Sequence, residues 1–358
     1  MSSRGYLEAN FLNDFKFTLN IAYDVFNTNQ TDFSTPIGGD AASVGGRGYK
    51  YSTRRGALNI NQLLNWTRAF NDHNITVLLG HETKNDKYDY MYGHMTNFAD
   101  PTNPEFSNAA QYQGLSSYSA EYALEGYFGK AEYNYANKYY LTASLRRDGS
   151  SKFHKDNRVG YFPSVSAGWN VHQEKWFQNP VMSKLKIRAS YGELGANFLN
   201  PYNFDAIAYG PIPYTVGGER YVTGRAAYLK SKDLKWETAK TTDIGIELGF
   251  FNNDLTLSVD YFVKKNVDLL AQIDLNLSSG QIFEINSSRE KPYVNTASVK
   301  NTGWEFMMNY RKQLTKDFHI DATFNIATLK NKVLSLGENV QPITSGAMSS
   351  YFNDAASI

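Results

Sequence analysis

Few residues in this chain have the type and the spacing that enzyme chemistry requires. His81 and Glu82 are adjacent, as in a zinc-binding helix, but no second histidine follows at the needed spacing and the segment alternates like a strand. Asp148 and Asp156 supply two carboxylates, yet glycoside hydrolysis needs such a pair in a protected cleft, and a solvated loop accounts for both. The glycine-rich run 38–48 lacks the strand-to-helix context of a phosphate-binding loop. We therefore predict no catalytic residue, no metal site and no cofactor, and we do not expect an enzyme.

Aromatic residues that could bind a ligand are concentrated in the segment 195–235. Beside asparagine and glycine, this segment holds Phe198, Tyr202, Phe204, Tyr209, Tyr214, Tyr221 and Tyr228. A tyrosine offers a flat apolar body with a polar tip, which suits contact with a sugar or a peptide. The alternative is that these rings pack the loop onto itself or meet a partner protein. We treat them as candidate substrate contacts in a long external loop.

The elements that must position these residues are strands, because apolar and polar side chains alternate along most of the chain. In the segment 254–267, for example, Leu255 and Leu257 alternate with Thr256 and Ser258, which is the two-residue period of a strand with one apolar face. About eleven such segments are predicted, at 14–26, 54–69, 74–92, 120–135, 138–148, 160–173, 183–194, 236–250, 254–267, 297–312 and 317–331. Most of them match or exceed the roughly 9–11 residues that a strand needs to cross a bilayer.

Short and long connections alternate between these segments. The short ones are 71–73, 136–137, 173–182, 252–253 and 313–316, and the long ones are 27–53, 93–119, 149–159, 195–235 and 268–296. Bacterial outer-membrane barrels alternate short periplasmic turns with long extracellular loops in the same way. The fold class that we predict is therefore all-β, a transmembrane antiparallel β-barrel.

The strand count indicates part of a barrel. Single-chain bacterial barrels have an even number of strands and both termini on the periplasmic side, whereas about 11 strands are half of the roughly 22 of the plugged outer-membrane transporters. We expect residues 1–358 to be a single barrel region that is truncated at both ends, with the plug domain absent. The start, Met1–Tyr6, has no apolar stretch of a signal peptide, so we expect an exported protein to begin upstream of it.

The polar face of the predicted strands carries ionisable side chains at alternate positions. They are Lys184, Lys186, Arg188, Asp243, Glu247, Asp260, Glu305 and Asp321. A charge on the lipid face of a barrel costs about 2–4 kcal/mol near the bilayer midplane. We therefore predict that these residues line a wet or plug-filled lumen, where they form the wall and take no part in catalysis.

Aromatic residues are expected at both membrane interfaces, since the chain contains 26 Tyr and 22 Phe and membrane barrels carry aromatic girdles. On the periplasmic side we expect Tyr139, Tyr140, Trp176, Phe177, Phe250 and Phe251, and on the outer side Tyr161, Phe162 and Trp236.

Composition excludes several other classes of protein. The net charge of +1 gives no general attraction to nucleic acid, so no nucleic-acid partner is expected. The absence of cysteine excludes a fold stapled by disulfides. No stretch approaches the roughly 18 consecutive apolar residues of a transmembrane helix.

Five ordered motifs carry a likeness to a known family. The longest is Lys138–Phe153 (KYYLTASLRRDGSSKF), and the others are Gly160–Ser164 through Trp169, Leu185–Gly192, Leu234–Thr238 (LKWET) through Leu270, and Asn331–Gly337 (NKVLSLG). Together they resemble the SusC/RagA family of TonB-linked outer-membrane proteins from Bacteroidetes. The likeness covers about residues 120–337 and is weaker upstream.

The resemblance implies a 22-stranded barrel in the cell outer membrane, in contact with its lipid, with an N-terminal plug. It also implies a SusD-like surface lipoprotein as partner, energy from the TonB complex, and import of glycans or peptides. We expect no plug, no TonB-contacting box and no terminal strand within residues 1–358, and the sequence reads Glu193–Asn197 where the family usually has a shorter Gly-Asn step. A non-transporting structural or adhesive outer-membrane β-protein remains the alternative, and a soluble carbohydrate-active enzyme is a third.

Overall fold

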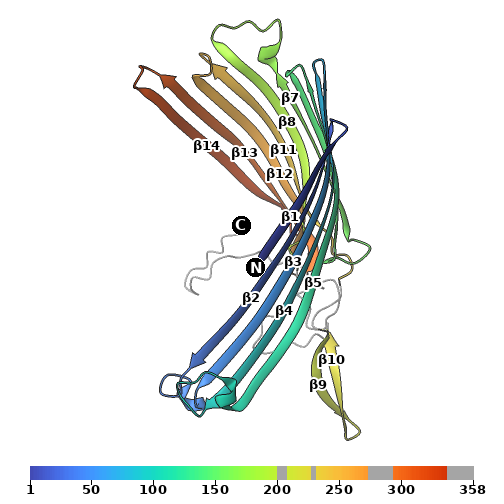
Figure 1. The fold of residues 1–358 in the computed structure, drawn as a ribbon, viewed down its shortest axis with the longest axis vertical. Coiled ribbons are helices and arrows are strands. Elements are labelled where there is room, and N and C mark those ends of the chain that lie inside the picture. Colours follow the sequence, from blue (N-terminus) through green and yellow to red (C-terminus); the bar gives the residue numbers. More distant parts are fainter. Residues whose placement is uncertain (200–207, 227–230, 273–292, 337–358) are drawn as a thin grey trace. The chain divides into compact units, whose positions relative to one another are not determined.

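A computed structural model describes residues 1–199, 208–226, 231–272 and 293–336, and most of them lie in strands (Figure 1). Twelve strands form one antiparallel sheet, in the order β1 (Ser2–Phe11), β2 (Phe15–Ser34), β3 (Arg47–Phe70), β4 (His73–Phe98), β5 (Ala109–Tyr135), β6 (Tyr139–Ser150), β7 (Val159–Asn170), β8 (Met182–Ala196), β11 (Glu237–Phe250), β12 (Leu255–Gln272), β13 (Tyr293–Gln313) and β14 (His319–Ser335). A separate hairpin consists of β9 (Ala208–Val216) and β10 (Glu219–Ala226). Within these ranges, no helix is long and apolar enough to cross a membrane.

The predicted all-β antiparallel class is confirmed, but the main sheet has one strand more than predicted. The missed strand is β1, whose residues are all exposed and whose sequence SSRGYLEANF sustains no apolar face. The hairpin was also missed, because Pro211 and Pro213 in β9 are residues that a central strand excludes. The order of the described strands ends at β1 and at β14, as expected for part of a barrel.

Tight turns join the strands at one end of the sheet. Several turn residues adopt a positive φ, among them Asn13 (60°), Asn71 (50°), Asn137 (56°) and Asn252 (58°). Asparagine tolerates this left-handed conformation better than most side chains, so it favours the two- to four-residue turn that a hairpin needs. The predicted alternation of short and long connections holds except that the connection 171–181 is longer than the connection 151–158.

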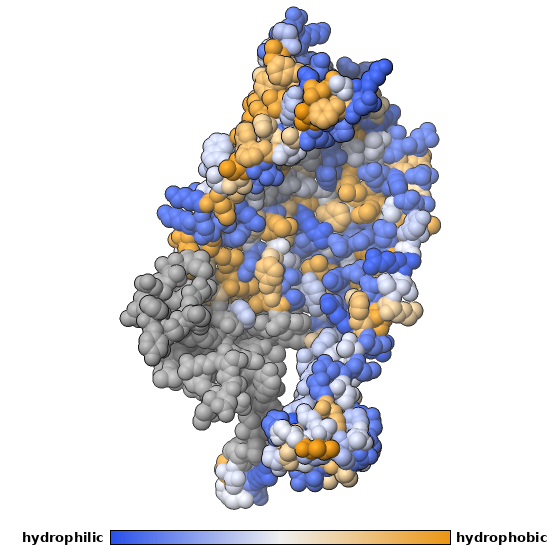
Figure 2. Space-filling model, turned by 90° about the vertical axis from the view of Figure 1, so that its left-hand side faces the viewer, coloured by the Kyte–Doolittle hydropathy of each residue, from blue (hydrophilic) through white to orange (hydrophobic). Residues whose placement is uncertain are grey.

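The chain divides into two compact units. The first comprises Met1–Ala9, Phe17–Leu63 and His81–Glu125, and the second comprises Asn10–Lys16, Leu64–Gly80 and Gly126–Ile358. On the face of the molecule shown in Figure 2, hydrophobic residues (orange) stand among hydrophilic ones (blue).

In the first unit, parts of β3, β4 and β5 carry polar side chains on both faces of the sheet. One face holds the ion pair of Lys87 with Glu121 (Nζ to Oε1, 3.4 Å), and Ser119 there donates a hydrogen bond of 2.6 Å to Asp89. The other face holds the ion pair of Arg55 with Asp86. A strand segment in a bilayer must turn an apolar face to lipid. These segments therefore lie outside the bilayer. This explains why the predicted strands 54–69, 74–92 and 120–135 are shorter than β3, β4 and β5, which also include residues 47–53, 93–98 and 109–119.

In the second unit, the two faces of the sheet differ in character. One row of neighbours crosses six strands and is apolar or aromatic throughout: Leu141, Ala167, Ala189, Ile244, Tyr261 and Trp304. The adjacent row, on the opposite face, is Tyr140, Gly168, Arg188, Gly245, Asp260 and Glu305. Ile244 and Trp304 are each 55% exposed, as lipid-facing side chains would be in the isolated chain.

An aromatic belt lies at the short-turn end of the second unit. Its ring contacts link Tyr135 to Tyr139 (6.3 Å between centroids), Tyr139 to Trp169 (6.3 Å), and Trp169 to Trp176 (6.5 Å). Amphipathic rings of this kind sit at the headgroup level of membrane barrels. Tyr140, which we had predicted for the same belt, instead lies on the charged face, because its position in β6 has the opposite parity.

Glu174, in the connection between β7 and β8, fixes part of this belt. It accepts hydrogen bonds from the Tyr139 hydroxyl, from Trp169 Nε1 (3.1 Å) and from Lys138 Nζ (3.2 Å). These donors, the Tyr139 hydroxyl foremost, hold the pKa of the Glu174 carboxyl below its usual value. The carboxylate is therefore the form that holds Tyr139 and Trp169 together.

Acidification should loosen the belt through Glu174. Because the folded-state pKa is lowered, the stabilisation is fully present above the unfolded-state pKa and is lost as the pH falls through the lower folded-state pKa. Tryptophan emission of the full-length protein should shift on acidification, and Glu174→Gln should reduce that acid-dependent shift. An equal shift in both proteins would show that another group is responsible.

Candidate functional site

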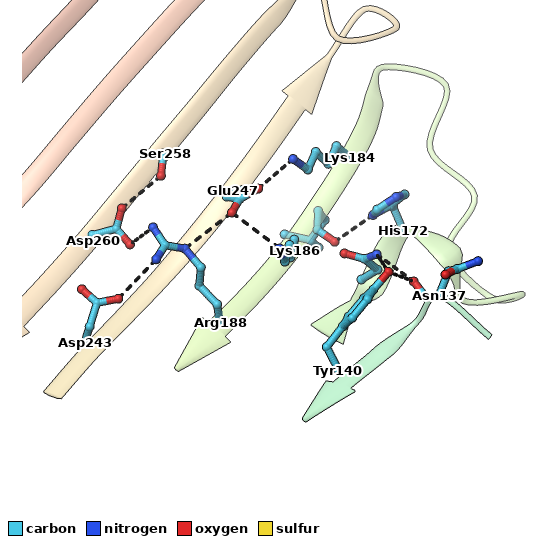
Figure 3. Close-up of polar contacts among 12 residues, drawn as sticks. Asn137, Tyr140, His172, Lys184, Lys186, Arg188, Asp243, Glu247, Ser258 and Asp260 are labelled. Carbon is cyan, nitrogen blue, oxygen red and sulfur yellow. Dashed lines mark hydrogen bonds and ion pairs between the residues drawn. The ribbon is translucent and has the colours of Figure 1, made fainter. Parts of the chain in front are cut away.

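The candidate site is a cluster of ionisable side chains on β8, β11 and β12, here called the charged wall (Figure 3). Its members are Lys184, Lys186, Arg188, Asp243, Glu247 and Asp260. Strand register brings them together, since Lys186 pairs with Glu247 across β8 and β11. Six of the eight residues predicted as wall residues thus meet in one cluster on one face of the sheet.

Arg188 is the centre of the charged wall. Its guanidinium lies 2.5 Å from Asp260 Oδ1 (Nη2), 3.3 Å from Asp243 Oδ1 (Nη1) and 3.5 Å from Glu247 Oε1 (Nε). The Asp260 side chain is only 10% exposed, and Ser258 donates a hydrogen bond of 3.0 Å to its second oxygen. A planar guanidinium with five N–H groups can serve several carboxylates at once, which an ammonium group cannot do with the same geometry.

The two lysines complete the wall on the side of the short turn. Lys184 Nζ lies 2.7 Å from Glu247 Oε2, and Lys186 Nζ lies 3.8 Å from Glu247 Oε1. Lys186 also lies over the ring of Tyr140, with Nζ 5.9 Å from its centroid. Three cations thus balance three carboxylates within the cluster, which has no net charge when all six are ionised.

Gly245 makes this arrangement possible. It lies between Arg188 and Asp260 in the register of β8, β11 and β12. A Cβ atom at this position would lie 1.9 Å from Asp260 Oδ1 and 2.9 Å from Arg188 Nε. The guanidinium can therefore cross β11 close to its backbone only because residue 245 has no side chain.

Replacing Gly245 should displace Arg188. We expect Gly245→Ala to lower the unfolding free energy of the full-length protein by about 1–3 kcal/mol, as overpacking does, measured by urea titration in lipid vesicles. Gly168→Ala is the matched control in the same row, because its Cβ would have Lys186 Cε at 3.6 Å, an ordinary contact. Equal losses in both variants would contradict the role assigned to Gly245.

Two predicted wall residues lie outside the cluster. Glu305 is exposed and stands opposite Asp260 in the register of β12 and β13. Asp321 forms an ion pair with Arg311 (Nη2 to Oδ2, 2.8 Å), in which the side chains are 40% and 72% exposed. The sequence also gave no reason to choose Ser258 or Tyr140, because their contacts depend on register and not on residue type.

A second feature of the second unit is a small apolar core at the loop ends of β6, β7 and β11, here called the loop-base core. Phe153 is fully buried, Leu234 is 1% exposed, and Trp236 packs on Phe153 (5.3 Å) and on Phe162 (5.5 Å). Trp236 Nε1 donates a hydrogen bond of 3.0 Å to the Arg158 carbonyl. The prediction that Phe162 and Trp236 lie at the lipid interface was wrong, because both rings are buried in this core.

Polar contacts close the same core around the ends of the long loop. Asn157 Nδ2 donates to the Lys232 carbonyl (2.9 Å), Lys152 Nζ donates to the Asn197 carbonyl (3.2 Å), and Asn197 Nδ2 donates to Ser150 Oγ (3.0 Å). The connection 151–158 therefore holds both ends of the loop that contains the β9–β10 hairpin.

The predicted substrate contacts lie in or near this loop. Phe198 is 80% exposed, and Tyr221 in β10 is 46% exposed, with its hydroxyl donating to Glu219 (3.1 Å). The backbones of Tyr214 and Tyr221 are paired across the hairpin, and that of Tyr209 pairs with Arg225. Tyr202, Phe204 and Tyr228 lie outside the described residues. Nowhere in the described ranges do three or more His, Asp or Glu side chains meet in a way that could hold a metal ion.

The sheet and its faces define a membrane barrel, and the chain belongs to the TonB-dependent receptor family: residues 2–348 match the family described as "TonB dependent receptor-like, beta-barrel". TonB-dependent receptor P3 of Formosa agariphila is 31% identical over 343 residues, an alignment that covers 92% of this chain and 32% of that protein. TonB-dependent receptor SusC of Bacteroides thetaiotaomicron is 28% identical over 358 residues, covering 96% of this chain and 33% of SusC. The chain thus spans about a third of the length of these curated relatives.

Solved structures show the same fold. The RagAB peptide importer in the "closed-closed" state superposes with a TM-score of 0.83 at 22% identity, covering 95% of this chain and 37% of that chain. The ferric citrate transporter FecA gives a TM-score of 0.53 at 11% identity, over 96% of this chain and 44% of FecA. The resemblance to the SusC/RagA family is therefore confirmed, and the chain is a protein of the outer membrane.

Proposed function

We propose that this chain forms the barrel wall and the extracellular loops of a TonB-dependent importer of glycans or peptides. The observation that carries the proposal is the sheet of the second unit, which has one apolar face and one face with the charged wall. Membrane barrels turn the apolar face to lipid and the polar face to the lumen. In this proposal residues 1–358 are a single barrel region, and all eight predicted wall residues, Glu305 and Asp321 included, face the lumen.

The relatives support the partners that we propose. The matched proteins are TonB-dependent receptors, so energy would come from the TonB complex of the inner membrane. A SusD-like surface lipoprotein would meet the loops on the outer side. The seven aromatic residues of the segment 195–235 would contact the substrate there, since the loop-base core holds both ends of this loop against β6 and β7. This loop would then present its rings from a fixed base.

The rival proposal is a structural or adhesive outer-membrane protein that displays loops without transport. It predicts the same sheet and the same loop-base core. Of the two proposals, only the transporter requires that nutrient uptake depends on the protein.

Deletion of the encoding gene from its source bacterium separates the two proposals. We expect growth to fail on some glycans or peptides supplied as the only carbon source, and to return when the wild-type gene is restored. Growth that is unchanged on every nutrient, together with weaker attachment of the cells to surfaces, would favour the adhesive protein.

A further inference from the structure

The first unit contains a group of aromatic rings on one face of β3, β4 and β5, here called the tyrosine ladder. Tyr49 stacks on His94 (4.3 Å between centroids, 19° between planes), and Tyr51 lies 5.1 Å from Tyr92. Tyr49 and Tyr51 are also nearly parallel, at 17° and 6.4 Å. Cross-strand ring pairs stabilise a sheet, but these rings remain partly exposed to solvent.

The ladder continues towards β5. Tyr118 lies 5.1 Å from Tyr90 and 5.9 Å from Tyr88, and it is 55% exposed. The rings thus form a partly exposed aromatic surface with hydroxyl groups at their rims. Since both faces of these strand segments carry polar side chains, the ladder lies outside the bilayer, in contact with water.

Two arginines beside the ladder are paired, whereas Asp32, whose charge acts on Tyr51, is held by the neutral amide of Gln30. Arg55 donates to both oxygens of Asp86, at 3.0 Å from Nε to each and 2.6 Å from Nη2, and Asp86 is 9% exposed. Arg47 is bound to Asp40 at 2.8 Å. The strands that bear the rings each have neighbours on both sides, so no backbone edge is open to an extended peptide. This surface therefore offers rings, hydroxyl groups and the Asp32 carboxylate, which can accept hydrogen bonds from the hydroxyl groups of a neutral ligand.

We infer that the tyrosine ladder is a binding surface for a neutral glycan chain, whose sugar rings would stack on Tyr49, Tyr51 and Tyr92. The inference rests on the proposed function and selects the glycan from its two substrate classes. A sugar ring has an apolar C–H face and a hydroxyl rim, so it complements a tyrosine that has an apolar body and a polar tip. A peptide would need an open strand edge for its backbone, and the described strands that bear the rings offer none.

The test uses uptake by the source bacterium. Labelled linear neutral oligosaccharides of glucose, galactose, mannose, xylose and fructose are supplied beside a mixture of oligopeptides, and deletion of the gene shows which uptake depends on the protein. We expect the dependent substrates to be neutral oligosaccharides. The double variant Tyr51→Ala/Tyr92→Ala should raise the KM of their uptake by about tenfold, the loss of two stacking contacts.

Two controls isolate stacking from folding. Tyr51→Phe/Tyr92→Phe keeps the rings and should leave KM close to the wild-type value, and Tyr161→Ala removes an exposed ring of β7 and should leave it unchanged. If the alanine variant fails to reach the cell surface, the uptake measurement is replaced by tyrosine nitration of the wild-type protein. The oligosaccharide should then protect Tyr51 and Tyr92 from nitration and leave Tyr161 reactive.

Several results would overturn the inference. One is that only the uptake of oligopeptides depends on the gene. Another is an unchanged KM in an alanine variant that is present at the cell surface, and a third is that the oligosaccharide does not protect Tyr51 and Tyr92 from nitration. If deletion alters no uptake, the proposed function fails. Glycan binding by the ladder is then tested by titrating the same oligosaccharides into the purified full-length protein. Binding that does not depend on Tyr51 and Tyr92 would contradict the inference.

Discussion

Arg188→Ala should destabilise the barrel more than any other single substitution in the charged wall. The change leaves Asp243, Glu247 and Asp260 facing one another without the guanidinium that joins them. Removing one partner of a fully buried ion pair costs about 3–5 kcal/mol. Because the Arg188 side chain is 37% exposed, we expect a smaller loss of about 2–3 kcal/mol. The measurement is the unfolding free energy of the full-length protein in lipid vesicles, from urea titration.

The pair of Arg311 with Asp321 supplies the control. It is another arginine–aspartate pair on strands of the same unit, but its side chains are 72% and 40% exposed. We expect Arg311→Ala to cost about 0–1 kcal/mol, as exposed pairs do. Asp260→Asn added to Arg188→Ala should recover part of the loss, because it removes a carboxylate that has lost its partner. Equal costs for the two arginine substitutions would mean that the cluster around Arg188 adds nothing to an ordinary surface pair.

Trp236→Ala should open the base of the long loop. The substitution removes a ring that is 8% exposed and packs on Phe153 and Phe162, and it leaves a cavity in a small core. Truncation of a buried tryptophan to alanine typically costs about 3–5 kcal/mol. Since the core joins the ends of one loop, we expect local opening, seen as faster proteolysis within residues 197–236 while the barrel stays folded.

Trp176→Ala is the matched control for the loop-base core. Trp176 is 66% exposed and lies in the aromatic belt, so its removal should leave cleavage of the loop unchanged. Trp236→Phe should give an intermediate rate, because phenylalanine fills part of the space but cannot donate to the Arg158 carbonyl. Cleavage of Trp236→Ala at the wild-type rate would show that the loop is held by its polar contacts alone.

The sequence was sufficient to predict the strands that carry one apolar face. In β12, for example, Leu255, Leu257 and Val259 alternate with polar residues, and the strand begins within a residue of the predicted start. The same signal fails where no face is apolar, as in β1 and in the outer parts of β3 and β4. There the strands are specified by pairing with their neighbours, which a single stretch of sequence does not reveal.

The candidate site was predictable in its membership but not in its contacts. Parity along β8 places Lys184, Lys186 and Arg188 on one face, but the sequence alone does not say that Gly245 lies beside Arg188. Phe162 shows the converse case. Its parity differs from that of Val165, Ala167 and Trp169, which was a signal that it faces the other way, but its place at a strand end favoured the lipid interface.

The row of Tyr140, Gly168, Arg188, Gly245 and Asp260 has a consequence for how the strands find their partners. Alternation of apolar and polar residues rejects a slip of one position, because such a slip exchanges the faces, but it tolerates a slip of two. A slip of two between β8 and β11 would place Arg188 against Asp243 or Glu247, each with its own Cβ, in place of Gly245. The observed alignment is the one that sets Arg188 against a residue without a side chain, so this row favours the observed pairing of β8 with β11.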